Sequence, residues 1–131
     1  MWYNRAMKTP EQLAWIALQR SMGAGWIVQR HEDRYSSGIP DVSYVLPGGA
    51  AGWIELKAGD RFEIRPDQAN WAAARAGWGA RCLVMALGAG GQWAGVRVSG
   101  ANLPQLRRAT RFEHLAALGR VGTGRELVLE L

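Results

Sequence analysis

The sequence is poor in cysteine, with Cys82 as the only thiol among 131 residues. A single thiol forms no internal disulfide and does not supply the cysteines of a structural zinc site. The sequence also lacks an apolar run of about 18 uncharged residues, the length that a membrane span requires, and its first residues lack the apolar segment of a secretory signal. We therefore expect a cytoplasmic protein of a reducing compartment, with no membrane partner.

Lysine is almost as scarce as cysteine. The 16 basic residues comprise 14 arginines and two lysines, Lys8 and Lys57. With 11 acidic residues the net charge is +5 and the pI is about 10.1, which is the direction expected of a protein that contacts phosphate. Because lysine is so rare in this chain, a lysine inside a structured motif needs a specific explanation.

Chain length and composition fit one folded domain. The chain is 48% hydrophobic with seven tryptophans, which is enough apolar material to offset chain entropy, and it has no internal repeat, low-complexity tract or linker. We expect a single domain over residues 1–131, with a core over about 9–99 and a C-terminal extension over about 100–131.

Local signals predict an alternation of helices and strands. Thr9 and Gln12 form a capping box around Pro10, so a helix is expected there, and Pro66 opens a second helix. The predicted helices span 9–22, 66–76 and one or two short segments within 102–119, and the predicted strands span 26–28, 41–46, 52–57, 80–87, 92–99 and 125–130. The core order αβββαβ predicts an α/β fold, with a mixed sheet flanked by helices.

Asp41, Glu55 and Lys57 lie on the two strands of a predicted hairpin. With the turn centred near Gly49, Asp41 is opposite Lys57 and diagonal to Glu55, so all three side chains share one face. A register change of two residues would keep them together, whereas a change of one residue would separate them.

This grouping suits hydrolysis of a phosphodiester. Two carboxylates about 7 Å apart on neighbouring strands form an oxygen-rich site for Mg²⁺ or Mn²⁺. Such a cation lowers the pKa of a bound water and screens the charge that develops on an attacked phosphate. The ammonium group of Lys57 would orient that water or stabilise the phosphate oxygens, which explains a lysine in an arginine-rich chain.

The pattern Pro40-Asp41, then Glu55-Leu56-Lys57, resembles the PD-(D/E)XK nuclease superfamily, and within it the VRR-Nuc branch and the archaeal-type Holliday junction resolvases. The likeness covers about residues 9–87, and includes an early helix with Glu11, a loop ending Ser-Gly-Ile-Pro-Asp, a Trp-x-Glu-x-Lys strand and a helix beginning Arg-Pro-Asp-Gln. It implies a restriction-endonuclease-like αβββαβ core.

The resemblance also implies roles for individual residues. Asp41 and Glu55 would be metal ligands together with the backbone carbonyl of Leu56, Lys57 would be the catalytic lysine, and Gln68 would support that lysine. Glu11 would be an outer acid of the metal site. Glu32 or Asp33 is the alternative third acid.

Basic and polar side chains flank the predicted site and are candidates for binding phosphate. They are Arg34, Ser36, Ser37, Arg61 and Arg65, with a second group at Arg107, Arg108 and Arg111. A solvated charged surface explains each of them equally well. Elsewhere, residues 88–91 read as a hairpin turn, Cys82 as a buried hydrophobe, His31 and His114 as ordinary surface or half-buried residues, and Trp2 and Trp93 as the exposed tryptophans.

The expected function is a divalent-metal-dependent DNA endonuclease, and the resemblance implies branched DNA such as Holliday junctions or flaps as its substrate. Resolution of a four-way junction takes two symmetric cuts, so we expect a homodimer with two-fold symmetry, and a small stand-alone nuclease suits a phage or another mobile element. The alternatives are a non-catalytic nucleic-acid-binding module on the same fold and a small-molecule enzyme that uses the same carboxylates. Loss of cleavage on removal of the metal separates the first two.

Overall fold

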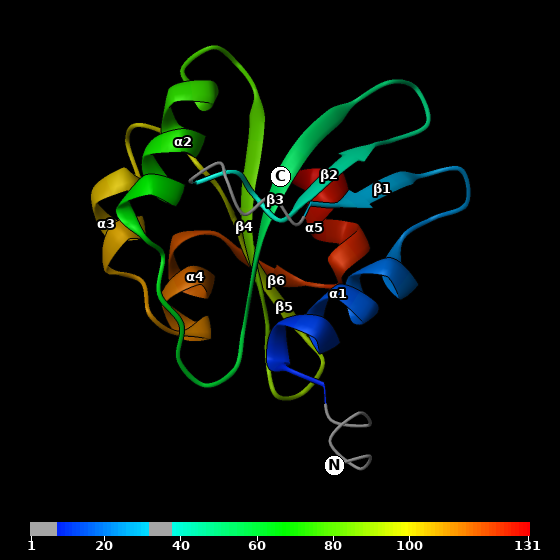
Figure 1. The fold of residues 1–131 in the computed structure, drawn as a ribbon, viewed down its shortest axis with the longest axis horizontal. Coiled ribbons are helices and arrows are strands. Elements are labelled where there is room, and N and C mark those ends of the chain that lie inside the picture. The colour runs from blue at the N-terminus through cyan, green and yellow to red at the C-terminus, as the bar shows by residue number, and fades with distance from the viewer. Residues whose placement is uncertain (1–7, 32–37) are drawn as a thin grey trace.

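A six-stranded sheet in the order β1-β2-β3-β4-β5-β6 forms the centre of the protein, as seen in a computed structural model (Figure 1). The structure describes residues 8–31 and 38–131. The strands are β1 (Ile27–Arg30), β2 (Val42–Val45), β3 (Ala51–Ala58), β4 (Arg81–Leu87), β5 (Trp93–Arg97) and β6 (Arg120–Gly122). The helices are α1 (Pro10–Ser21), α2 (Pro66–Ala76), α3 (Leu103–Arg108), α4 (Phe112–Leu118) and α5 (Gly124–Glu130).

The sheet is mixed. β1, β2 and β3 are antiparallel neighbours, β3 and β4 are parallel, and β4, β5 and β6 are again antiparallel. A parallel pair needs a crossover connection, and α2 is the helix of that crossover. The predicted α/β class, the mixed sheet and the element order αβββαβ are confirmed.

Helix α1 begins where the sequence predicts. The Thr9 hydroxyl accepts a hydrogen bond from the Gln12 backbone N–H at 3.1 Å, and the Gln12 side-chain oxygen accepts one from the Thr9 N–H at 2.9 Å. Pro10 takes the first helical position, where no N–H is needed. This capping box sets the start of the helix, and Ala14 and Leu18 turn towards the sheet and are fully buried.

Helices cover both faces of the sheet (Figure 1). One apolar core lies between the sheet and helices α1 and α5, and includes Leu18, Ile54 and Leu56. The other lies between the sheet and helices α2, α3 and α4, and includes Ala69 and Leu106. Successive side chains of β3 alternate between these two layers, so one strand contributes both to a hydrophobic core and to the opposite, more polar face.

Residues 100–131 are built into the same sheet and the same two cores. β6 extends the sheet beside β5, Leu106 and Leu115 join the core under α2, and Leu127 joins the core under α1. The predicted strand over 125–130 is wrong, because this segment forms α5. Thr123 caps that helix by accepting a hydrogen bond from the Glu126 N–H at 3.1 Å, and the buried positions 124, 127 and 128 follow helical spacing.

The hairpin of β2 and β3 forms, with a register two residues away from the predicted one. Val42 pairs with Ile54, so continuation of the register places Asp41 opposite Glu55 and not opposite Lys57. The turn is centred one residue earlier than Gly49, because Leu46 pairs with Ala50 through a 2.7 Å backbone hydrogen bond. A shift of two residues preserves the alternation of side chains, so all three residues keep the same face.

The structure also tests three smaller predictions, of which two are confirmed and one is wrong. The Gly88 N–H donates to the Gln92 carbonyl at 2.8 Å across the turn from β4 to β5, which confirms the hairpin, and Cys82 is fully buried as expected. Trp93 was expected at the surface, and this is wrong: it is 3% exposed because β5 directs it into the core of α1 and α5. Among the described residues, no helix is both long and apolar enough to cross a membrane.

Candidate active site

The candidate site lies where β2 and β3 part. β2 pairs with β3 only from Val42 onward, whereas β3 continues past Ile54 to Ala58. Beyond the last pair, the Leu56 N–H donates to the Asp41 carboxylate at 2.9 Å. The Asp41 carboxylate therefore accepts the hydrogen bond that a backbone carbonyl of β2 would accept if the two strands stayed paired. This bond fixes the carboxylate beside the edge of β3.

Pro40 explains why the fork stays open. In the observed register Pro40 is the next position opposite Leu56, and a proline has no N–H to donate. The N–H and C=O of one strand residue point to the same side of the strand. The Leu56 carbonyl therefore faces the fork beside Asp41, which is the position that the resemblance implies for a backbone metal ligand.

Glu55, Lys57 and Gln68 form a closed triangle of polar contacts. Lys57 Nζ lies 3.2 Å from Glu55 Oε2 and donates to Gln68 Oε1 at 3.0 Å. Gln68 Nε2 in turn donates to Glu55 Oε2 at 2.9 Å. The side chains of Lys57 and Glu55 are only 12% and 8% exposed, so these contacts hold the ammonium group in one place.

Glu55 is a buried carboxyl group whose charged form is disfavoured. Its pKa is raised from 4.5 to about 8, first by burial and next by the neighbouring Asp41 carboxylate, with Lys57 acting in the opposite direction. Both donors reach Oε2, while the buried Oε1 has no hydrogen-bond partner. An unpartnered carboxylate oxygen beside a second carboxylate favours a proton or a cation between them.

Glu11 reaches the same cluster from the first turn of α1. Partial burial of its carboxyl group raises its pKa, Asp41 raises it further, and Arg30 and Lys57 act in the opposite direction. The Glu11 carboxyl is therefore close enough to Asp41 and Lys57 to interact with their charges, and its role as the third acid stays a prediction. Glu32 and Asp33, the alternative third acids, lie outside the described residues.

The donor set fits a hard divalent cation. The carboxylates of Asp41 and Glu55 and the Leu56 carbonyl supply oxygen only, which Mg²⁺ and Mn²⁺ prefer, and Glu55 Oε1 is a buried oxygen without a donor. Within residues 8–31 and 38–131, no three His, Cys, Asp or Glu side chains form a complete group of metal ligands. Two carboxylates and one carbonyl would therefore leave the remaining positions on a cation to water and substrate.

Gln68 has two roles at once. It is the third residue of α2, and its side-chain oxygen accepts a hydrogen bond from the Arg65 N–H at 3.1 Å, as in a capping box. The same oxygen accepts from Lys57. The start of α2 and the position of the lysine are thus set by one amide group.

The structure describes only some of the predicted phosphate-binding residues. Arg34, Ser36 and Ser37 lie outside the described residues. Arg61 and Arg65 are exposed on the connection before α2, and Arg65 Nε lies 3.3 Å from Asp67. In the second basic group, Arg107 donates to the side chain of Asn70 on α2, and Arg108 and Arg111 are exposed.

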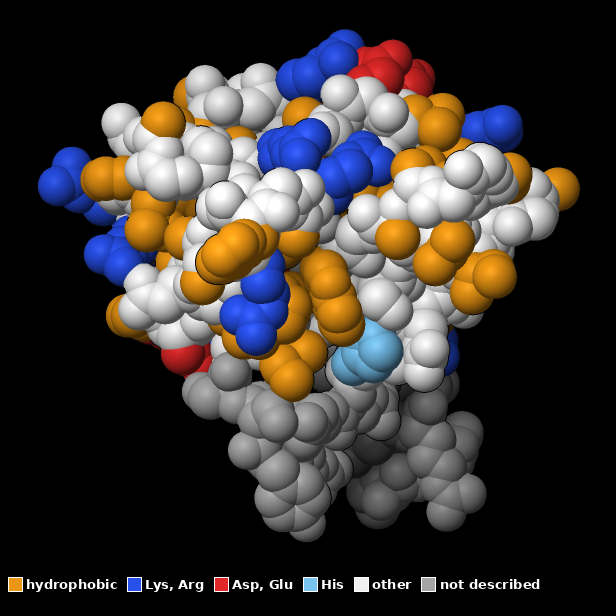
Figure 2. Space-filling view, turned by 90° about the horizontal axis from the view of Figure 1, so that it is seen from above, with side chains coloured by type: hydrophobic (Ala, Val, Ile, Leu, Met, Phe, Trp, Pro, Cys, Tyr) orange, Lys and Arg blue, Asp and Glu red, His pale blue; other side chains and the backbone are white. Residues whose placement is uncertain are grey.

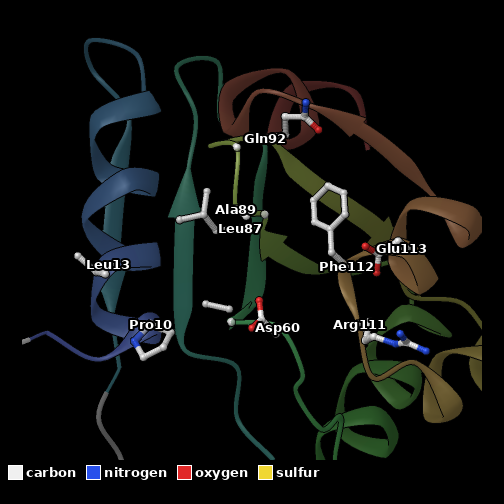
Figure 3. Close-up of a pocket in the computed structure, with 13 residues that line it drawn as sticks. Pro10, Leu13, Asp60, Leu87, Ala89, Gln92, Arg111, Phe112 and Glu113 are labelled. Carbon is white, nitrogen blue, oxygen red and sulfur yellow. The ribbon is translucent and has the colours of Figure 1, made fainter.

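A cavity of about 510 Å³ lies beyond Lys57, at the end of β3 (Figure 3). It is lined by Pro10, Leu13, Ala58, Gly59, Asp60, Leu87, Gly88, Ala89, Gly90, Gln92, Arg111, Phe112 and Glu113. None of the predicted catalytic side chains lines it, although Pro10 and Ala58 are chain neighbours of two of them. Its charged lining residues are two carboxylates, Asp60 and Glu113, and one cation, Arg111.

The structure adds aromatic neighbours that the sequence analysis did not connect with the site. The ring centroids of His31 and Trp53 are 5.4 Å apart, and those of Trp53 and Trp71 are 5.3 Å apart. Spacing was the available signal: Trp53 precedes Glu55 by two residues on a strand, and Trp71 follows Gln68 by three on a helix. Both spacings put the residues on shared faces.

Comparison of the chain with protein families, with curated proteins and with solved structures gives no match. The assignment of function therefore depends on the geometry of the site.

Proposed function

We propose that this chain is a divalent-metal-dependent DNA endonuclease of the PD-(D/E)XK superfamily, similar to its VRR-Nuc and Holliday junction resolvase branch, with a restriction-endonuclease-like core. One observation carries the proposal: Asp41, Glu55 and Lys57 meet at the fork between β2 and β3, with Gln68 bonded to two of them. The resemblance gave these residues their roles, and their convergence supports it.

Each residue of the site has a distinct task in this proposal. Asp41, Glu55 and the Leu56 carbonyl would hold Mg²⁺ or Mn²⁺, with Glu11 as an outer acid. The bound cation supplies Lewis acidity and a water of lowered pKa. Gln68 and Glu55 hold the Lys57 ammonium at the mouth of the fork, where it stabilises negative charge on the attacked phosphate or orients the attacking water.

The substrate and assembly follow the same resemblance. We propose branched DNA, such as a junction or flap, as the substrate, and a homodimer with two-fold symmetry as the form that makes paired cuts. Described apolar side chains available at the surface for such a contact include Ile27, which is 66% exposed, and Trp78, which is 94% exposed. We also propose a cytoplasmic location and an origin in a phage or another mobile element.

A cleavage panel with a matched pair of variants tests the proposal. Labelled four-way junction, flap, linear duplex and single strand are incubated with Mg²⁺, Mn²⁺ or EDTA, using the wild type, Lys57→Ala and Lys8→Ala. The last two remove the only two lysines of the chain, so each loses the same charge and the same side chain. Metal-dependent cleavage that is lost in Lys57→Ala and kept in Lys8→Ala supports the site.

Two results would contradict it. Equal cleavage by Lys57→Ala and the wild type removes the lysine from the mechanism. Binding of DNA by the folded wild type without cleavage of any substrate favours the non-catalytic binding module.

A further inference from the structure

A continuous strip of rings and one guanidinium group borders the candidate site. We define this aromatic strip as His31, Trp53, Trp71 and Arg75. The His31 and Trp53 rings are tilted by 40°, Trp53 meets Trp71 edge to face at 74°, and the Arg75 guanidinium lies 3.7 Å from the centroid of the Trp71 ring. Each contact has the separation of a favourable aromatic or cation–π pair.

The strip and the site are carried by the same three parts of the fold. β3 contributes Trp53 to the strip and Glu55 to the site, two residues and about 7 Å apart along the strand. α2 contributes Trp71 and Gln68, one turn apart. The His31 N–H donates to the Asp41 carbonyl at 2.6 Å. The strip is therefore held at a fixed distance from the catalytic carboxylates.

The strip is partly open to solvent and positively charged. Trp53 and Trp71 are half-buried, because one part of each indole packs against the core under α2 while the rest remains exposed. His31 is also half-buried, with Nε2 at 2.8 Å from the Ser43 hydroxyl, and Arg75 is exposed. Figure 2 shows a face on which hydrophobic side chains gather around basic ones.

Such a surface discriminates between paired and unpaired nucleotides. Inside a duplex the faces of the bases are stacked on one another, so a protein ring cannot reach them. An unpaired base at a flap, fork or junction exposes its faces, and aromatic rings and the guanidinium plane of arginine both stack on them. The positive charge of Arg75 also suits the adjacent phosphate.

We propose that the aromatic strip binds an unpaired nucleobase next to the phosphate that is cleaved, so that the preferred substrate is DNA with an unpaired nucleotide at a branch point. This inference rests on the proposed nuclease function only in placing the base next to a phosphate that is cleaved. The binding step stands on the strip itself and is measured without cleavage.

The test compares binding of two DNAs in EDTA, where a metal-dependent nuclease does not cut. One is a flap with 2-aminopurine at the unpaired position of the branch, and the other is a continuous duplex of the same length. Arg75→Gln removes the guanidinium from the strip, and Trp71→Leu removes a ring while keeping the charge. Arg125→Gln is the matched control, because Arg125 is exposed and lies 5.8 Å from the centroid of Trp26, a residue that packs on the core of the opposite face.

We expect the variants of the strip to lose affinity for the flap and to keep their affinity for the duplex. The wild type binds the flap more tightly than the duplex and quenches 2-aminopurine emission by stacking. Arg75→Gln weakens flap binding about tenfold, with a change of less than about twofold on the duplex, and the quenching disappears. Trp71→Leu does the same if circular dichroism shows it folded, and Arg125→Gln changes neither DNA. Because Arg75 is exposed, Arg75→Gln alone decides the test if the tryptophan variant fails to fold.

Three outcomes overturn the inference. They are equal weakening of flap and duplex by Arg75→Gln, an equal effect of Arg125→Gln, and dissociation of a wild-type dimer by Arg75→Gln in sedimentation, which would make the strip a subunit interface. Flap-selective binding without Mg²⁺- or Mn²⁺-dependent cleavage removes the nuclease proposal and keeps the strip. Cleavage that depends on Lys57, with binding indifferent to Arg75, does the opposite.

Discussion

The two faces of β3 differ in what they contribute to the protein. Ile54 and Leu56 point towards α1 and are 0% and 1% exposed, within an apolar core. Glu55 and Lys57 alternate with them and point to the other side, where they contact each other and Gln68. A single strand thus alternates two hydrocarbon side chains with two charged ones at consecutive positions.

The apolar face of β3 contributes to stability, whereas the polar face carries the candidate site. The apolar face gains free energy from burial, about 1.5–3 kcal/mol for each large side chain. The polar face works in the other direction, because burial of Glu55 next to Asp41 disfavours its charged form and raises its pKa to about 8. Substitutions on the apolar face should therefore lower stability and leave cleavage nearly unchanged, whereas substitutions on the polar face should lower cleavage and leave the fold intact.

The largest effect is expected from Asp41→Asn. Cleavage should fall on the order of 10³-fold, because the proposed cation site loses one of its two carboxylate ligands. The fold should persist, since the asparagine carbonyl still accepts from the Leu56 N–H, and DNA binding should be kept or strengthened because a negative charge near phosphate is removed. Single-turnover cleavage and a binding titration measure both, and retained cleavage would remove Asp41 from the site.

Ile54→Ala should show the reverse profile. Deletion of a fully buried side chain lowers the free energy of unfolding by about 2–5 kcal/mol. Cleavage per folded molecule, measured at low temperature, should stay within about threefold of the wild type, because the charged face is untouched. Val121→Ala on β6, where the side chain is 49% exposed, is the control and should change stability by less than about 0.5 kcal/mol. Urea unfolding measures both changes. Similar losses of unfolding free energy in the two variants would contradict the assignment of Ile54 to the core.

Glu55→Gln tests the polar face through pH. The pKa of Glu55 is about 8 in the folded protein and 4.5 when unperturbed, so the folded state binds the proton more tightly than the unfolded one. The stability associated with the protonated group is complete below about pH 4.5 and is lost as the pH rises through about 8. Urea unfolding in EDTA from pH 5 to 9 should show a steeper loss in the wild type than in Glu55→Gln. Parallel curves for the two proteins would contradict the raised pKa.

The smallest effect is expected from Gln68→Ala. Cleavage should fall about tenfold, because Lys57 loses the acceptor that orients it, and the helix cap lost at the same time should lower stability by about 1 kcal/mol. Gln12→Ala removes the equivalent capping-box residue of α1, which has a similar bond to its own N-cap and no contact with Lys57. That control should lose similar stability and keep its cleavage rate. Equal cleavage by both variants would reduce Gln68 to a helix cap.

The sequence predicted the elements whose signals are local. The Thr9–Gln12 capping box and the glycine-containing turns place α1 and the hairpins, and strand alternation puts Asp41, Glu55 and Lys57 on one face in either of the two registers. The exact pairing was missed because it depends on the centre of one loop, which several glycine turns satisfy equally well.

The wrong strand prediction over 125–130 comes from a segment in which two periodicities compete. Residues 125–130 contain valine and leucines that suggest a strand, whereas Thr123 and Glu126 have the spacing of a helix start. The helix wins because Leu127 and Val128 reach the core beside α1 in that form. The contacts between His31, Trp53 and Trp71 join three separate parts of the chain, the end of β1, β3 and α2. Spacing places Trp53 on the face of Glu55 and Trp71 on the face of Gln68, but it predicts no contact between the rings.

The bond between the Leu56 N–H and Asp41 also makes one backbone proton a reporter of the site. This amide is held by a side chain at the fork, so its chemical shift and its rate of hydrogen exchange depend on whether the Asp41 carboxylate is free to accept. A titration with Mg²⁺, followed at this single amide resonance by NMR, would detect occupation of the fork without any DNA present.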